Sequence, residues 1–174
     1  MSKIYTRRGD HGITTLANGK TAAKTSELIE FYGCLDELSA FLGWTLEACY
    51  SKNELNELSK KICRIQRELF DLNTQLIAAN VIGNSNIAVL EQEIDMISKQ
   101  LPPLNFFILP GGGEISARLH ITRAICRRAE CAAFKLNLPQ NKENITVYLN
   151  RLSDWFYIVA RYAAFLLKIE EICL

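Results

Sequence analysis

Apolar residues recur at steps of three and four positions in five separate segments of this chain, and this spacing limits its fold more than any other feature. Such steps place the apolar side chains along one face of a helix. No stretch shows a convincing alternation of apolar and polar residues, which is the pattern of a half-buried strand. We therefore predict an all-α fold, a five-helix bundle. The expected helices cover Glu27–Tyr50, Leu55–Ala79, Ile87–Leu101, a segment from Gly113 to about Asn137, and one that begins near Asn144.

Local signals indicate where these helices begin and end. Ser51 and Glu54 have the spacing of a capping box, which would open the second helix. Residues 83–86 are expected to form a turn, and Pro102-Pro103 to stop the third helix. A chain of 174 residues is long enough for one domain, in which we assign residues 1–25 to an arm and residues 26–174 to the bundle.

Composition excludes several classes of protein. The net charge of +1 gives no sign of a nucleic-acid-binding surface. The apolar stretch Trp155–Ile169 is interrupted by Arg161 and is too short to span a bilayer, and the N-terminus has no apolar signal segment. The six cysteines include no Cys-x-x-Cys pair and there are two histidines, which argues against a zinc cluster. We expect a cytoplasmic protein with no membrane and no nucleic-acid partner.

The segment His120–Glu130 carries the clearest candidate site. On a helix, Arg123, Arg127 and Glu130 share one face. Two arginines one turn apart repel by about 0.2–0.5 kcal/mol unless an anion lies across them, and the glycine run before this helix precedes a helix N-terminus, which favours anions. A solvated charged face is the alternative. The apolar residues expected to point from the opposite face into the core are Ile121, Ile125 and Ala132.

The first 25 residues combine glycine with hydroxyl and cationic side chains. Glycines let backbone N–H groups approach a phosphate, hydroxyls donate to its oxygens, and Arg and Lys supply positive charge. The spacing is not that of a Walker A loop. A phosphate-binding arm and a frayed polar terminus both stay open from these residues alone.

Three further positions are candidates, each with an ordinary alternative. Asp36 lies in a stripe of small residues and would either pair with an arginine elsewhere or be an exposed acid. Phe107, which follows Phe106 in a loop, would wall a site for a large flat ligand or anchor the loop in the core. Asn150 lies on a polar stripe that would hold a nucleotide or face water and that also contains Asp154, Tyr157 and Arg161. Because a cationic face directed away from the core is best closed by another subunit, we expect an oligomer with sites at its interfaces.

Four segments, in order along the chain, carry a more specific pattern. They read TRRGDHGITTL, YGCLDELSAFLG, FILPGGGEISARLHITRAICRRAE and YLNRLSDWFYIVAR. Together they resemble the PduO-type ATP:cob(I)alamin adenosyltransferases, or corrinoid adenosyltransferases, over nearly the whole chain. The resemblance implies a five-helix bundle that assembles as a homotrimer with active sites between subunits. It also implies an enzyme that transfers the 5′-deoxyadenosyl group of ATP to the cobalt of cob(I)alamin and releases adenosylcobalamin and triphosphate.

The resemblance also implies roles for individual residues. Asp36 and Arg123 would form an intersubunit ion pair beside the cobalamin and, with Arg127, serve catalysis. Phe107 would pack against the lower face of the corrin and displace its axial base. Mg²⁺ would bridge the phosphate oxygens. The ATP contacts would be Thr6, Arg7, Arg8, Gly9, Asp10, Thr14, Thr15, Lys24, Arg127, Arg128, Glu130 and Asn150.

Three positions depart from the usual family pattern. Cys131 follows the CRRAE block where arginine is common, Ser39 replaces a common asparagine, and His11 lies inside the GDxG turn. Of these, the Cys131 change would weaken an interface or nucleotide contact. A non-catalytic carrier of adenosylcobalamin and a bundle without a ligand are the alternatives to the enzyme. The partners left open are a reductase and an adenosylcobalamin-dependent enzyme.

Overall fold

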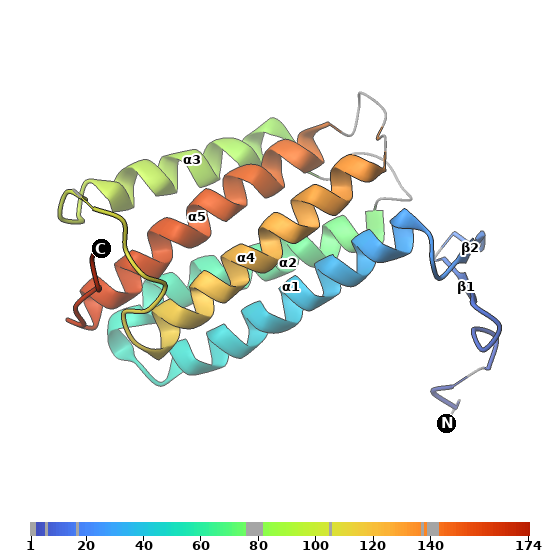
Figure 1. The fold of residues 1–174 in the computed structure, drawn as a ribbon, viewed down its shortest axis with the longest axis horizontal. Coiled ribbons are helices and arrows are strands. Elements are labelled where there is room, and N and C mark those ends of the chain that lie inside the picture. Colours follow the sequence, from blue (N-terminus) through green and yellow to red (C-terminus); the bar gives the residue numbers. More distant parts are fainter. Residues whose placement is uncertain are drawn as a thin grey trace.

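The computed structural model describes residues 3–5, 7–16, 18–75, 82–104, 106–136, 138 and 143–174. Within these ranges its helices are α1 (Glu27–Tyr50), α2 (Asn56–Gln75), α3 (Asn84–Ser98), α4 (Glu114–Lys135) and α5 (Asn144–Leu166), with a 3₁₀ turn at Asn53–Leu55. The helices lie side by side along the long axis of the molecule (Figure 1). Helix α1 packs against α2 and α4, and α5 packs against α4 and α3. The predicted all-α five-helix bundle is confirmed.

The core forms where the apolar faces of the helices meet, and its largest fully buried side chains include Trp155, Tyr148 and Phe31. One predicted core residue is misplaced. Ile125 and Ala132 are buried as expected, but Ile121 is 43% exposed. Buried residues of α4 centre on Leu119, Cys126 and Ala133, and Ile121 lies about 200° around the helix from Leu119 because each residue turns the helix by about 100°.

Two of the predicted helix boundaries are wrong. Ser51 does not open α2 but follows the end of α1, where its hydroxyl donates to the Ala48 carbonyl at 2.8 Å. Residues 83–86 are not only a turn, because α3 already begins at Asn84, and the Asn86 side chain accepts a hydrogen bond from the Gly83 amide at 3.1 Å. The end of the second helix predicted at Ala79 lies outside the described residues.

The N-terminal arm contains two short strands that the sequence pattern did not predict. Strands β1 (Ile13–Thr15) and β2 (Thr21–Ala23) pair antiparallel, with Thr14 opposite Ala22. Figure 1 shows this hairpin projecting from the end of the bundle where α1 begins. Across the described residues, no helix is long and apolar enough to cross a membrane.

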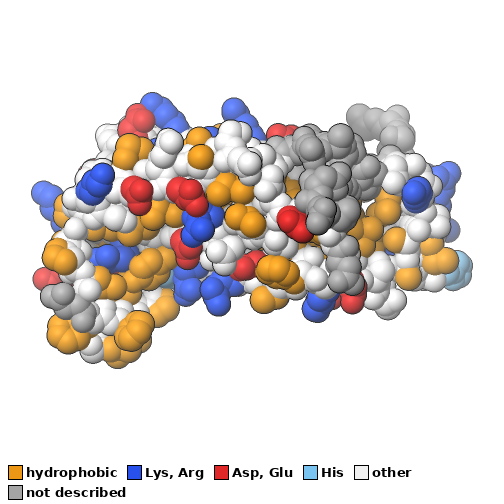
Figure 2. Space-filling model, turned by 90° about the horizontal axis from the view of Figure 1, so that it is seen from above, with side chains coloured by type: hydrophobic (Ala, Val, Ile, Leu, Met, Phe, Trp, Pro, Cys, Tyr) orange, Lys and Arg blue, Asp and Glu red, His pale blue; other side chains and the backbone are white. Residues whose placement is uncertain are grey.

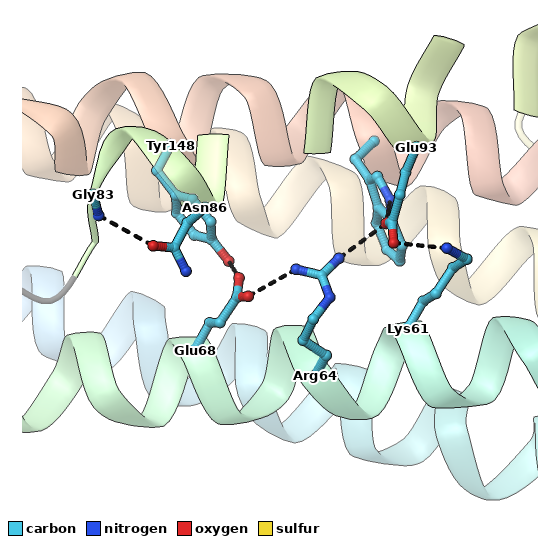
Figure 3. A network of polar contacts seen from close by, with 8 residues as sticks. Lys61, Arg64, Glu68, Gly83, Asn86, Glu93 and Tyr148 are labelled. Atoms are coloured by element: carbon cyan, nitrogen blue, oxygen red, sulfur yellow. Dashed lines mark hydrogen bonds and ion pairs between the residues drawn. The ribbon is translucent and has the colours of Figure 1, made fainter. Parts of the chain in front are cut away.

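A network of polar side chains joins α2, α3 and α5 (Figure 3). Glu93 on α3 is 6% exposed and accepts hydrogen bonds from Lys61 (2.7 Å), Arg64 (2.9 Å) and the Trp155 indole N–H (2.7 Å). Arg64 also donates to Glu68 at 2.7 Å. A buried carboxylate is tolerated here because three donors satisfy it. The apolar periodicity of α2 did not suggest this network, because Lys61, Arg64 and Glu68 lie beside the apolar face and not on it.

Replacing Glu93 with alanine should destabilise the bundle strongly. Lys61, Arg64 and the buried Trp155 would each lose an acceptor, and because both cations are about one-third exposed to water, the cost should lie near the lower end of the roughly 3–5 kcal/mol typical for breaking a buried ion pair. The free energy of unfolding, measured by urea denaturation, should fall by that amount. Glu57→Ala is the control, because it removes a fully exposed ion pair and should leave the urea midpoint almost unchanged. Equal midpoints for the two variants would contradict the prediction.

Candidate functional site

The outward face of α4 carries two arginines that have no anionic partner in the part of the chain that the structure describes. Arg123 is half-buried and Arg127 is exposed, one helical turn further on. Among the described residues, neither side chain forms an ion pair, and the Arg123 Nε is buried without a hydrogen-bond partner. An anion placed across the two guanidinium groups would remove their repulsion and supply the missing acceptor. This face therefore has the charge and the open hydrogen-bonding capacity to receive an anion.

Two of the predicted nucleotide residues meet beside this face. Glu130 Oε1 accepts a hydrogen bond from Asn150 Nδ2 on α5 at 2.9 Å, so the fold joins the CRRAE and YLNRLSD blocks. Arg128 lies elsewhere and forms an ion pair with Glu37 on α1. Its role as an ATP contact stays a prediction, and in this chain a carboxylate already neutralises its charge. No sequence motif pointed to Glu37, which directly follows the candidate Asp36.

Asp36 and Arg123 do not meet within one chain. Helices α1 and α4 pack antiparallel. On α4, Arg123 lies between Arg128, which forms the ion pair with Glu37, and Arg118, whose Nη1 donates to the Trp44 carbonyl at 2.6 Å. The part of α1 that lies opposite Arg123 is therefore between Glu37 and Trp44, and Asp36 lies before it, toward the start of α1. It is exposed and, within the described part of the chain, has no ion-pair partner. The predicted pair would therefore need a second copy of the chain.

In the arm, Lys24 lies beside the turn that contains Gly9 and Gly12. The Lys24 amide donates to the Gly12 carbonyl at 2.8 Å. A Cβ atom at Gly9 would lie 3.0 Å from Lys24 Nζ, so the glycine makes room for this side chain. Thr6 lies outside the described residues. The other predicted ATP contacts of the arm are all exposed or half-exposed: Arg7, Arg8, Gly9, Asp10, Thr14, Thr15 and Lys24.

Phe107 lies at the opposite end of the bundle from the arm, in the loop between α3 and α4 (Figure 1). Its side chain is 84% exposed and that of Phe106 is 64% exposed, so neither ring anchors the loop in the core. Figure 2 shows hydrophobic side chains gathered at this end of the molecule, on the left. The exposed large apolar residues described in the loop and in the C-terminal tail are Leu104, Phe106, Phe107, Leu109, Ile169, Ile172 and Leu174.

His120 is a buried titratable group beside Arg123. His120 is 4% exposed, its Nδ1 has no hydrogen-bond partner among the residues described, and its ring meets that of Tyr157 edge-on at 6.1 Å between centroids. Burial, and to a lesser extent the charge of Arg123, lowers the pKa of His120 to about 4. The imidazole is therefore neutral at pH 7 and adds no positive charge to the arginine face.

Acid should destabilise the chain through this histidine. Between the ordinary His pKa of 6.5 and about 4, the unfolded chain binds a proton that the folded chain excludes, so stability falls as the pH drops through this window. The loss is at most about 3.5 kcal/mol, because the pKa is lowered from 6.5 to about 4 and each pKa unit corresponds to about 1.4 kcal/mol. Urea midpoints at pH 7.5 and pH 5 should differ less for His120→Gln than for wild type. His11→Gln, in the exposed arm, is the control and should keep the wild-type difference.

One predicted polar stripe is divided by the fold. On α5, Asn150 and Asp154 are exposed, but Arg161 is 7% exposed and donates to Glu171 at 3.1 Å. The stripe is therefore neither entirely solvated nor entirely available to a nucleotide. A charged residue inside an apolar run, followed by two acids ten residues later, was the available signal for this pair.

The chain is similar to proteins of known family. The family model for cobalamin adenosyltransferase matches residues 4–163. The chain belongs to this family. Its relatives include the human corrinoid adenosyltransferase MMAB, which is 40% identical over 174 residues that cover 94% of this chain and 70% of that protein. The corrinoid adenosyltransferase of Bacillus subtilis is 38% identical, with 91% and 85% covered.

Solved structures of the family have the same fold. A variant PduO-type ATP:corrinoid adenosyltransferase from Lactobacillus reuteri, complexed with cobalamin and ATP, superposes with a TM-score of 0.89 at 30% sequence identity. The match covers 99% of each chain. Another variant of that protein, complexed with ATP, gives a TM-score of 0.89 at 31% identity and covers 98% of this chain and 99% of that one.

Proposed function

We infer that this member of the cobalamin adenosyltransferase family is an ATP:corrinoid adenosyltransferase, an enzyme that transfers the 5′-deoxyadenosyl group of ATP to the cobalt of cob(I)alamin. The observation that carries the inference is the α4 face, where Arg123 and Arg127 have no anionic partner among the described residues and Glu130 is hydrogen-bonded to Asn150. A triphosphate supplies the anion that this face lacks. Retention of these cations disfavours a carrier that only holds adenosylcobalamin, which would have little need for them.

The proposed reaction requires little proton transfer by the protein. The electron pair of Co(I) forms the Co–C5′ bond, the C5′–O bond of ATP breaks, and its electrons leave with triphosphate, while cobalt passes from Co(I) to Co(III). Cob(I)alamin is a strong nucleophile, so no general base is required. The chain must align the ribose carbon with the cobalt and stabilise the charge that gathers on the triphosphate.

We assign these two tasks to different ends of the chain. The arm, through Arg7, Arg8, Lys24 and its hydroxyls, would hold the phosphates together with Arg127 on α4. Phe107 would lie against the lower face of the corrin, where an apolar ring excludes the axial base. Loss of that ligand makes Co(II) easier to reduce to the reactive Co(I). Phe107 is well placed for this contact because its ring is exposed rather than packed in the core.

The separation of these parts supports sites shared between subunits. The arm projects from one end of the bundle and the Phe107 loop lies at the other (Figure 1). At a rise of about 1.5 Å per residue, Arg127 lies about 20 Å along α4 from Gly113, where that loop ends. The adenosyl carbon must nevertheless touch the cobalt. We propose the homotrimer of the family, in which one copy's arm and another copy's loop close one site; a monomer on gel filtration would contradict this.

Mg²⁺ would enter with the ATP phosphates. Among the described residues, no group of three His, Cys, Asp or Glu side chains could hold a metal unaided. Mg²⁺ in proteins is usually held by one or two carboxylates together with substrate phosphates and water. Glu130 fits that requirement, because it lies three residues from Arg127 and, within the ranges that the structure describes, accepts a hydrogen bond at Oε1 alone. When bound, the ion would neutralise phosphate charge, and the proposed cationic side chains would do the same.

An anaerobic absorbance assay tests the proposed reaction. Purified protein is mixed with chemically reduced cobalamin and MgATP, and the light-sensitive adenosylcobalamin spectrum is followed together with triphosphate release. Growth of the spectrum with one triphosphate per adenosylcobalamin supports the transferase. Bound cobalamin without product would favour the carrier and direct attention to Cys131. We also propose a cytoplasmic location, with a reductase and an adenosylcobalamin-dependent enzyme as partners.

A further inference from the structure

The C-terminal tail, residues 167–174, runs alongside the loop that carries Phe107. After α5 the chain turns at Lys168, where φ is +56°, and runs back beside residues 106–109. The Leu174 amide donates to the Phe107 carbonyl at 2.8 Å, and the Leu109 amide donates to the Ile172 carbonyl at 2.9 Å. Across the described part of the chain, these are the backbone hydrogen bonds of residues 106–109, and both go to the tail.

A buried arginine ties this tail to the beginning of the same loop. Arg161 on α5 is 7% exposed, and its Nε donates to Glu171 Oε2 in the tail at 3.1 Å. Its Nη2 donates to the Pro102 carbonyl at 3.3 Å, where the loop leaves α3. One rigid guanidinium therefore holds both segments against α5. Between them lies a cleft of about 300 Å³, lined by Pro102, Leu104, Phe106, Arg161, Glu171 and Cys173.

The far end of the loop is packed against the tail as well. A Cβ atom at Gly113 would lie 2.5 Å from Ile169 Cδ1, so the tail occupies the space that any other residue at this position would need. Gly113 also has a φ of +88°, which favours glycine. The tail thus touches the loop from Phe107 to its junction with α4. Phe107 itself contributes no buried side chain to this arrangement, because its ring is 84% exposed.

We propose that Arg161 is a positioning residue, which acts through Glu171 and the tail to hold the Phe107 ring where a corrin can lie against it. The proposal rests on the proposed function, because it takes the role of Phe107 from there. An exposed ring on a loop held by two backbone bonds would otherwise sample many orientations. Fixing the loop removes this freedom before the corrin binds, and less binding energy is then spent on ordering it.

Two variants test the proposal. Glu171→Gln removes the negative charge that pairs with Arg161 and keeps the shape of the Glu171 side chain. Deletion of residues 172–174 removes both backbone bonds to the loop and leaves the ion pair in place. The matched control is Glu91→Gln, which neutralises a similar contact, Arg151 Nε to Glu91 Oε1 at 3.0 Å, on another part of the surface. Each protein is examined by hydrogen exchange, MgATP calorimetry, and the visible and EPR spectra of cob(II)alamin bound with ATP.

We expect both variants, but not Glu91→Gln, to exchange the hydrogen-bonded amide of Leu109 roughly tenfold faster, because its bond to the tail is weakened in one variant and removed in the other. The base-off fraction of cob(II)alamin should fall severalfold, with ATP affinity unchanged. Unchanged exchange in the loop would overturn the proposal, as would faster exchange with a wild-type base-off fraction. If wild-type protein itself forms no base-off cob(II)alamin, the role of Phe107 fails, and with it the proposal, whereas the exchange data still report whether Arg161 fixes the loop.

Discussion

Replacing Arg127 with alanine should reduce turnover by about 100-fold to 1,000-fold or more, the loss typical when a group that stabilises transition-state charge is removed. Arg127 is exposed and, within the described part of the chain, makes no ion pair, so its side chain contributes little to the stability of the fold. Its proposed work is to stabilise the triphosphate as it leaves. Initial rates of adenosylcobalamin formation at saturating MgATP measure the effect.

The control for this variant is Arg67→Ala. Arg67 is an exposed arginine on α2, outside the proposed site. Both variants should keep the wild-type helix content and a free energy of unfolding within about 0.5 kcal/mol of wild type, as is usual for surface substitutions. Near-normal activity of Arg127→Ala would remove the phosphate assignment and with it the main support for the proposed site.

Replacing Phe107 with alanine should leave MgATP binding intact and abolish the formation of base-off cob(II)alamin. The ring is 84% exposed, so little core packing is lost. Without an apolar group against the lower face of the corrin, the axial base stays on the cobalt and Co(II) remains hard to reduce. The visible and EPR spectra of bound cob(II)alamin report the axial ligand directly, and calorimetry reports the affinity for MgATP.

Phe70→Ala is the matched control for the loss of an exposed aromatic ring. Phe70 is 66% exposed on α2, away from the loop and the tail. It should give wild-type spectra, wild-type ATP affinity and wild-type turnover. If Phe107→Ala gave the same spectra as Phe70→Ala, the aromatic ring would have no part in removing the axial base, and another residue at the corrin-binding end would have to be sought.

The helices could be predicted because their signal is local. A stripe of apolar residues such as that in α2 must be buried, whatever its neighbours are, because the cost of leaving it in water depends on its own composition. Boundaries were less secure. Ser51 has the residue type and spacing of an N-cap, but its hydroxyl donates to the Ala48 carbonyl of the preceding helix, an alternative that the sequence pattern does not distinguish.

The residues of the candidate site were predicted by resemblance, and the fold decided which of them lie together. Glu130 and Asn150 are 20 residues apart and meet because α4 packs on α5. Arg128 has the same local context as Arg127, but the packing of α1 gives it Glu37 as a partner. The neighbouring helix α1 therefore determines that Arg128, and not Arg127, forms an ion pair among the described residues.

The sequence by itself determined the class of fold, the positions of the five helices and the family, because apolar periodicity and short motifs are written into contiguous residues. Only the tertiary structure showed that Glu93 is a buried acceptor, that Arg161 binds the tail, and that the arm and Phe107 lie at opposite ends of one chain. These features depend on contacts between distant segments. A charged side chain is stable in the interior only when packing brings its partner to hydrogen-bond distance, and no local pattern records that distance.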